Sequence, residues 1–220
     1  MSLFSGNQQT MTAQKVSKKA AIREENMQHI ISVAEKVFAT KGYGGATTQE
    51  IADYAGLPKA NIHYYFPSKE DLYLAVLKNI LDIWILDADI LEQYDDPKTA
   101  LGAYIELKMN HSFSHPYASK VWASEIIQGA PVLGSQLKTY LAKWSKRKIR
   151  KIQSWINSGA IVAVKPENLL YMIWASTQHY ADFNHQIKVP NSGRVMNAKQ
   201  RQIAIDDVKS IILRGIGIDV

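Results

Sequence analysis

Helix start and stop signals recur along the chain from about Ala21 onward, and no stretch shows the alternating pattern of a half-buried strand. Glycine and proline, which mark the turns of β folds, account for only 12 and 7 of the 220 residues. Lys41 and Gly42 form a typical helix end, because a basic last turn precedes a glycine. Asp96 and Pro97 form a typical helix start. The sequence therefore predicts an all-α fold.

The same signals predict how the chain is divided. A boundary fits best within the helix that starts at Ser68, because that helix would connect a small N-terminal bundle to a larger C-terminal one. We predict a flexible arm over residues 1–20, an N-terminal domain over residues 21–68 and a C-terminal domain over residues 69–220. The predicted helices span residues 21–41, 47–55, 58–66, 68–93, 97–114, 117–128, 133–158, 166–187 and 197–214.

Several classes of function are disfavoured by what the sequence lacks. The absence of cysteine excludes disulfides, thiolate zinc sites and thiol nucleophiles, and it fits a reducing cytoplasm. No apolar stretch approaches the length of about 18 residues that a membrane span needs, and residues 1–14 are too polar for a secretory signal. No phosphate loop, nucleophile elbow or HExxH motif is present. We therefore expect a cytoplasmic protein without a cofactor, and its net charge of +6 permits an anionic partner.

Residues 47–66 have the form of two short helices around a glycine turn. Thr47 and Glu50 have the spacing of a capping box at the start of the first helix. Gly56 can adopt the left-handed backbone that a tight turn requires, and small alanines before it allow close packing. This pattern is typical of a helix-turn-helix, in which the second helix enters the major groove of DNA.

The second of these helices carries side chains that suit DNA. Lysine can donate to guanine, asparagine can pair with adenine, an aromatic ring can contact a thymine methyl, and tyrosine or histidine can donate to phosphate. A lysine just beyond it lies near a helix start, where backbone amides favour anions. The candidates are Lys59, Asn61, His63, Tyr64, Tyr65 and Lys69. The pattern alone leaves a second interpretation open, in which two ordinary short helices of an α-helical enzyme bury the same aromatic residues.

A longer motif runs at fixed spacing through this segment and into the next helix. It consists of Thr47, Thr48, Ile51, Ala52, Ala55, Gly56, Asn61, Ile62, Tyr64, Tyr65, Phe66, Ser68, Lys69 and Leu72. The motif resembles the N-terminal domain of TetR-family transcriptional regulators, and the resemblance covers about residues 22–72. Pro58 stands where the family commonly has a serine, and His63 stands where it often has a tyrosine.

The resemblance implies a mode of DNA binding. It implies that Thr47 and Thr48 contact phosphate, that Gln49 reaches a base, and that the candidates of the second helix read bases or contact the backbone. It also implies a homodimer, because two recognition helices related by a twofold axis read a pseudo-palindromic operator in double-stranded DNA. The arm, with lysines at positions 15, 18 and 19, either adds DNA contacts or is a solvated tail.

A segment near the C-terminus carries side chains suited to a small flat ring. Trp174, Gln178 and Asp182 recur at intervals of four, which places an indole, an amide and a carboxylate along one face of a helix. Such a set can stack on a polar ring and hydrogen-bond its edge. The alternative is a dimer helix whose glutamine and aspartate find partners across the interface.

The stretch MIWASTQHYADF that holds these three residues is similar to its counterpart in pyrimidine-responsive repressors of the TetR family. The resemblance implies that Trp174 and Gln178 contact a small nitrogenous ring such as uracil or thymine. It offers Asp182, Glu125 and Lys108 as further ligand-binding candidates. Lys108 shares a helix face with apolar residues, so its ammonium either points inward or snorkels to the surface.

Two other groups of residues have weaker functional interpretations. His111 and His115 lie four apart on one helix, but no third ligand is evident, so we expect no metal site. The basic residues between Lys143 and Lys151 form either a second DNA patch or, in the interpretation we prefer, a solvated helix face.

We therefore predict a TetR-like protein with an N-terminal helix-turn-helix bundle and a C-terminal bundle for ligand binding and dimerisation. It would be a transcriptional repressor, not an enzyme, and a small-molecule effector would shift it between arrangements that differ in DNA affinity. Three alternatives stay open: a TetR-type repressor with a different effector, a helical enzyme acting on a small ring, and a DNA-binding activator or architectural protein without a ligand.

Overall fold

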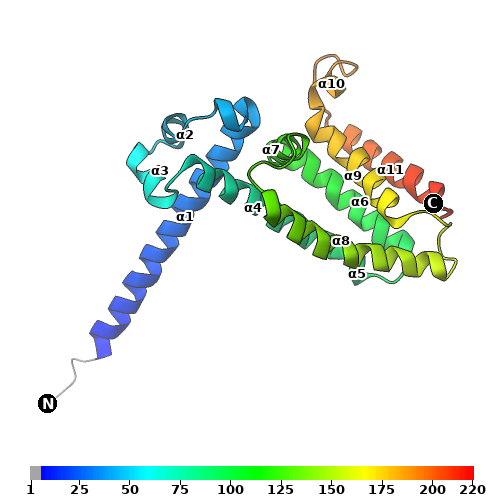
Figure 1. The fold of residues 1–220 in the computed structure, drawn as a ribbon, viewed down its shortest axis with the longest axis horizontal. Helices are drawn as coiled ribbons and strands as arrows, with labels where there is room; N and C mark the ends of the chain where they lie inside the picture. Colours follow the sequence, from blue (N-terminus) through cyan, green and yellow to red (C-terminus); the bar gives the residue numbers. More distant parts are fainter. Residues whose placement is uncertain (1–5) are drawn as a thin grey trace. The chain divides into compact units, whose positions relative to one another are not determined.

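The computed structural model describes the backbone of residues 6–220, and it describes their side chains except at positions 6–18, 85–88, 135–138, 140 and 141. All regular structure in this described part of the chain is helical, which confirms the all-α prediction (Figure 1). In chain order the helices are α1 (Gly6–Gly45), α2 (Thr48–Ala55), α3 (Lys59–Tyr65), α4 (Lys69–Ala88), α5 (Ile90–Gln93), α6 (Pro97–Ser114), α7 (Pro116–Ile127), α8 (Gly134–Asn157), α9 (Pro166–Asp182), α10 (Asn184–Lys188) and α11 (Ala198–Gly215).

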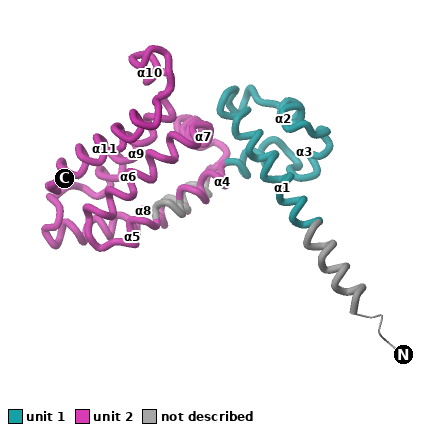
Figure 2. The backbone as a smooth tube through the Cα atoms, turned by 180° about the vertical axis from the view of Figure 1, so that it is seen from behind, with its two compact units in different colours: residues 1–76 teal, residues 77–220 magenta. Residues whose placement is uncertain are grey.

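The chain forms two compact units, residues 1–76 and residues 77–220 (Figure 2). The division falls inside α4, whereas the predicted domains meet between residues 68 and 69. Helix α1 begins at Gly6, within the segment for which we predict a flexible arm. Residues 1–5 of that segment, and the side chains of Lys15 and Lys18, lie outside the described residues, so the arm stays a prediction.

The N-terminal unit is built around the regular part of α1. The helix is interrupted at Gly42, whose φ of 72° is accessible to glycine, in agreement with the predicted helix end. Helix α2 starts at Thr47, whose side chain accepts a hydrogen bond of 3.2 Å from the amide of Glu50. It ends at Gly56, which has a left-handed φ of 66° and turns the chain into α3. The buried core consists of Ile30, Ala34, Val37, Phe38, Ile51, Ala52, Ala55, Ile62, Phe66, Leu72, Tyr73 and Val76.

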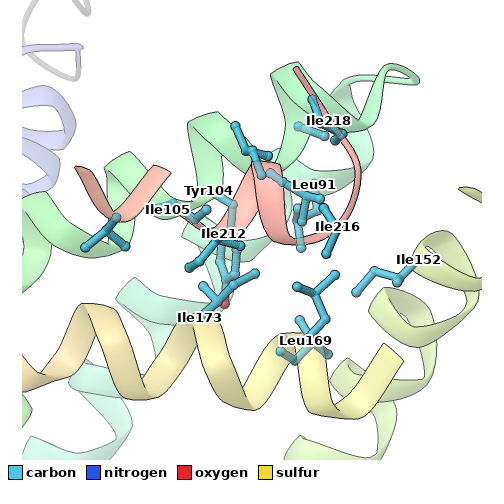
Figure 3. Packing of buried hydrophobic residues seen from close by; sticks show 14 of the residues in the cluster. Leu91, Tyr104, Ile105, Ile152, Leu169, Ile173, Ile212, Ile216 and Ile218 are labelled. Atoms are coloured by element: carbon cyan, nitrogen blue, oxygen red, sulfur yellow. The ribbon is translucent and has the colours of Figure 1, made fainter. Parts of the chain in front are cut away.

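Helix α6 is the central element of the C-terminal unit, and α9 and α11 pack against it (Figure 1). Its buried side chains lie on several faces, as expected for a helix covered on more than one side. Figure 3 shows side chains of α6, α9 and α11 converging with Leu91 of α5 and Ile152 of α8. This apolar cluster holds α6 and α9, which carry all of the predicted ligand-binding residues except Glu125 of α7.

Two predicted helices are divided in the structure. The predicted helix over residues 68–93 is split into α4 and α5, and the one over residues 166–187 is split into α9 and α10 at Phe183. Neither break contains proline or glycine. Phe183 leaves the helical conformation with a φ of −109° and a ψ of 29°, and its exposed ring stacks on His179 at 5.0 Å.

The basic run of α8 is partly neutralised by the segment around α5. Lys148 is almost completely buried and donates to Glu92 at 3.1 Å and to Asp89 at 3.4 Å. Arg147 also pairs with Glu92, and Lys151 pairs with Asp95 at 2.8 Å. Burial lowers the pKa of Lys148, while the charge of Asp89 opposes that shift. These ion pairs connect α8 to the segment around α5. The basic run is therefore not, as a whole, a solvated helix face, which was the interpretation that we preferred.

Candidate DNA-binding surface and effector site

Helix α3 is anchored by one buried side chain and exposes its polar ones. Ile62 is completely buried, and Phe66, just past the helix end, is buried with it. Tyr64 is 71% exposed, although an aromatic ring of this size is usually covered in a folded domain. Tyr65 is half-buried and contacts the Tyr64 ring edge-to-face at 5.1 Å. The other predicted contact residues of this helix, Lys59, Asn61 and His63, are all exposed.

The start of α2 presents the remaining candidates of the helix-turn-helix. Thr47 is exposed, and its hydroxyl oxygen serves as the helix cap, which leaves the hydroxyl proton available to a phosphate oxygen. Thr48 is half-buried. Gln49 is exposed, and its side-chain amide donates at 2.8 Å to Asp53, which lies one turn further along the helix.

Lys69 and His63 both contact backbone carbonyls of this unit. The ammonium of Lys69 donates to the carbonyls of Tyr43 at 2.8 Å and Ala46 at 3.1 Å, and it lies 4.5 Å from the centre of the Tyr43 ring. Lys69 therefore ties the start of α4 to the chain that leads into α2. The Nδ1 of His63 lies 3.3 Å from the carbonyl of Pro67, which can only accept, so Nδ1 carries the proton in this contact.

Inside the C-terminal unit, Lys108 of α6, Ser119 of α7 and Asp182 of α9 form what we call the polar cluster. Ser119 donates to Asp182 at 2.6 Å, and the charge of Lys108 acts on the same carboxylate. Lys108 is only 5% exposed, so of the two predicted orientations it adopts the inward one. Its ammonium lies 4.3 Å from the centre of the Trp84 ring, and Trp84 meets Trp122 edge-to-face at 5.2 Å.

The pKa of the Asp182 carboxyl group is raised above its ordinary value. Burial raises the pKa of Asp182, and the Ser119 hydroxyl together with the positive charges of Lys108, His179 and Lys120 works in the opposite direction. A partly buried carboxyl between a hydroxyl donor and a lysine can accept an N–H from a ligand.

Two further predicted ligand-binding residues, Trp174 and Gln178, lie on α9 like Asp182 and differ in their contacts. Trp174 donates its indole N–H to the Tyr104 hydroxyl at 3.1 Å, and its ring packs against Trp144 at 5.6 Å. Gln178 is half-buried, and its amide makes no hydrogen bond to any residue that the structure describes.

Glu125 has a structural role. It is 2% exposed, and one carboxylate oxygen accepts hydrogen bonds of 2.8 Å from the amides of both Val132 and Leu133. Two such bonds satisfy backbone donors in the turn that leads into α8. The structure thus gives Glu125 a clear function in the fold.

Sequence reasoning missed Ser119, Trp84, Trp122 and Tyr104 as members of this region. Ser119 and Trp122 lie on α7, and Trp84 lies on α4, so no local spacing connects them to α9. A tryptophan and a serine in a helix are ordinary residues, and only the packing of α7 against α9 reveals their proximity.

The two histidines at the end of α6 do not form part of a metal site among the described side chains. His111 and His115 stack with their ring centres 5.3 Å apart. Among the side chains that the structure describes, no group of three or more potential ligands could hold a metal ion. Within the described residues, none of the helices has both the length and the apolar character to cross a bilayer.

Comparisons with known proteins cover both units. Residues 30–76 match the family described as bacterial regulatory proteins, tetR family, and residues 77–219 match the family described as YcdC-like protein, C-terminal region. The chain is 38% identical over 187 residues to the HTH-type transcriptional regulator RutR of Escherichia coli K12, a match that covers 85% of this chain and 88% of that protein.

Solved structures share the fold at low sequence identity. The ketosteroid transcriptional regulator KstR2 of Mycobacterium tuberculosis superposes with a TM-score of 0.72 at 18% identity, covering 88% of this chain and 95% of that one. AibR, solved in complex with isovaleryl coenzyme A and operator DNA, superposes with a TM-score of 0.68 at 16% identity, covering 84% of this chain and 97% of that one. The match to RutR, together with the family match, sets the enzyme alternative aside. The chain belongs to the TetR family of transcriptional regulators.

Proposed function

We propose that the chain is a homodimeric repressor that binds a pseudo-palindromic operator and releases it when a small nitrogenous ring, uracil or thymine, occupies the C-terminal unit. The observation that carries the DNA-binding half is the exposed face of α3, where Lys59, Asn61 and Tyr64 project from a helix anchored only by Ile62. This is the side-chain set of a recognition helix, since amine, amide and ring can each contact a base edge.

The polar cluster supports a ring with alternating donors and acceptors. Asp182 can accept from a ring N–H, while Lys108 can donate to a ring carbonyl. Trp84 and Trp122 supply flat apolar surfaces beside these groups. The half-buried Gln178 adds an amide that can form two hydrogen bonds with such an edge. The sequence resemblance to pyrimidine-responsive repressors points to the same class of ligand.

A second copy of the chain would cover an apolar face of α9 and α11. Met172 on α9 and Phe183 just past its end are 62% and 53% exposed, and Ile203 and Ile211 on α11 are 50% and 71% exposed. Large exposed apolar side chains on two neighbouring helices are candidates for burial against a partner. A twofold interface buries the same patch of both copies, and it would supply the two recognition helices that a pseudo-palindrome requires.

The control mechanism needs a difference in effector affinity between two states. One arrangement of the dimer fits the operator and the other does not. The effector can lower DNA affinity by no more than the factor by which it binds the second arrangement more tightly than the first. A tenfold change in DNA affinity requires a preference of about 1.4 kcal/mol.

A gel-shift titration of the purified chain with the DNA upstream of its own coding sequence tests this proposal. We expect binding by a dimer, and we expect uracil or thymine to weaken it at least about tenfold. Binding that no pyrimidine changes would favour an activator or architectural protein, or a repressor with another effector. A monomer that ignores the DNA would contradict the proposal as a whole.

A further inference from the structure

A cavity of about 200 Å³ lies at the end of the C-terminal unit where α6, α9, α10 and α11 approach one another. We call it the α10 cavity, and its lining includes Phe113, Tyr180, Ile187 and Met196 together with two basic residues, Lys188 and Arg201. None of the polar-cluster residues lines it. The α10 cavity is therefore separate from the effector site of the proposed function.

The walls of the α10 cavity are aromatic and apolar. Phe113 and Tyr180 meet edge-to-face with ring centres 5.5 Å apart. Ile187 from α10 and Met196 from the following loop contribute aliphatic surface. Such a lining suits the apolar body of a small ligand, because its burial removes hydrocarbon from water.

Its charged groups are exclusively positive. Arg201 is held in place, since its Nε donates to the Met196 carbonyl at 3.0 Å and its guanidinium lies 5.4 Å from the centre of the Phe113 ring. No acidic side chain lines the cavity, and neither Arg201 nor Lys188 forms an ion pair with a carboxylate of the described residues. A guanidinium fixed at one nitrogen retains its outer N–H groups for a bidentate anion.

The hydroxyl of Tyr180 adds a donor. Burial, and to a lesser degree the negative charge of Asp207, raises the pKa of Tyr180, so the hydroxyl keeps its proton at neutral pH. A protonated hydroxyl can donate to a carboxylate oxygen.

We propose that the α10 cavity is a second ligand site of this chain, which binds a small organic carboxylate through Arg201 and Lys188 and packs its apolar body against Phe113 and Met196. This site does not depend on the identity of the effector. It assigns a binding role to two cations that the helix-turn-helix and the polar cluster do not use.

Methionine-methyl NMR on the full-length chain tests the site, with benzoate as the probe and neutral benzamide as its matched control. We expect the Met196 methyl signal to shift with increasing benzoate until the site is saturated. A Met196→Leu variant assigns this signal, because the signal is missing from its spectrum. The buried Met109 and the exposed Met172 serve as references outside the cavity. Benzamide should bind at least about tenfold more weakly, because it lacks the charge that the guanidinium recognises. Equal binding of the two probes, or an unmoved Met196 signal, would overturn the proposal.

Two variants locate the anion contact. Arg201→Gln should weaken benzoate binding about tenfold or more, whereas Arg194→Gln, which removes the same charge from an exposed position outside the cavity, should leave it unchanged. Because Arg201 also supports the Met196 carbonyl, Lys188→Gln provides a second variant, expected to weaken binding several-fold. Wild-type benzoate affinity in every variant that folds would overturn the proposal. Strong binding of sodium phosphate, equal to that of benzoate, would also overturn the proposal, because it would identify a site for inorganic anions.

Discussion

Ser119 on α7 donates a hydrogen bond of 2.6 Å to Asp182 in the last turn of α9. The bond joins two helices that are far apart in the sequence and pack side by side in the C-terminal unit. Ser119 is 3% exposed, so its hydroxyl reaches the carboxylate in a region that water hardly enters. Protonation turns one oxygen of this carboxyl group from an acceptor into a donor, so the protonation state of Asp182 bears on both stability and ligand binding.

Asp182 should make the stability of the chain depend on pH. Its pKa in the folded chain lies above the ordinary value of 3.8 because of burial. The folded state thus holds the proton more tightly than the unfolded state, and this contribution to the free energy of unfolding is lost as pH rises through the folded pKa. The wild type should lose stability relative to Asp182→Asn as pH rises from about 4 to about 7, measured by urea unfolding. A difference that stays constant or grows with pH would contradict this.

The exposed side chains of α3 should contribute to DNA affinity without contributing to stability. Lys59→Met and Tyr64→Ala should each weaken operator binding by about 1–3 kcal/mol and leave the melting temperature unchanged. If Lys59 contacts phosphate, its variant should also reduce the slope of log affinity against log salt by about 1. Lys146→Met and Tyr94→Ala are matched exposed controls in the C-terminal unit and should bind like wild type.

Lys69 should behave differently from Lys59. Lys69→Met removes two charge-assisted hydrogen bonds to backbone carbonyls and the contact with Tyr43, so we expect a loss of roughly 1–3 kcal/mol in the free energy of unfolding. Thermal melting followed by circular dichroism would measure it, with Lys59→Met as the matched variant. Equal melting temperatures for the two variants would show that the tie to the Tyr43 and Ala46 carbonyls adds nothing to stability.

Gln178→Ala should separate effector binding from DNA binding. The amide makes no hydrogen bond with any described residue, so its removal should cost the fold little. We expect uracil affinity, measured by calorimetry, to fall about tenfold, and DNA affinity without effector to stay at the wild-type value. Gln153→Ala on the exposed side of α8 is the control. Normal release of DNA by uracil in Gln178→Ala would place the effector elsewhere.

Charge reversal at Lys148 should be the most damaging single change in the basic run of α8. Lys148→Glu would bring a third carboxylate against Asp89 and Glu92 at a nearly water-free position, and we expect a loss of about 3–5 kcal/mol in the free energy of unfolding. Lys143→Glu makes the same charge change at an exposed position of the same helix and should stay within about 0.5 kcal/mol of wild type. Similar values for both variants would show that burial of Lys148 has no energetic consequence.

The elements that carry local signals could be predicted from the sequence. Thr47 with Glu50, Gly56, and Asp96 with Pro97 mark helix ends through interactions between neighbours in the chain, and the structure has helix boundaries at each of them. The fold class and the exposed face of α3 follow from the same kind of local information.

What could not be predicted depends on contacts between distant segments. The break at Phe183 has no proline or glycine to mark it. The buried position of Lys148 depends on acidic residues more than fifty positions earlier, and the region around Asp182 depends on α4 and α7. Spacing along α9 placed Trp174, Gln178 and Asp182 on one helix but could not show that the Trp174 indole N–H is occupied by Tyr104.

All five tryptophans belong to residues 77–220, and the N-terminal unit has none. Trp84 sits under the ammonium of Lys108 and against Trp122, beside the carboxylate where we place the effector. All tryptophan fluorescence of the chain thus comes from the C-terminal unit, and the N-terminal unit contributes none. Effector occupancy can therefore be followed by tryptophan emission on an unlabelled protein, without a direct signal from the DNA-binding half.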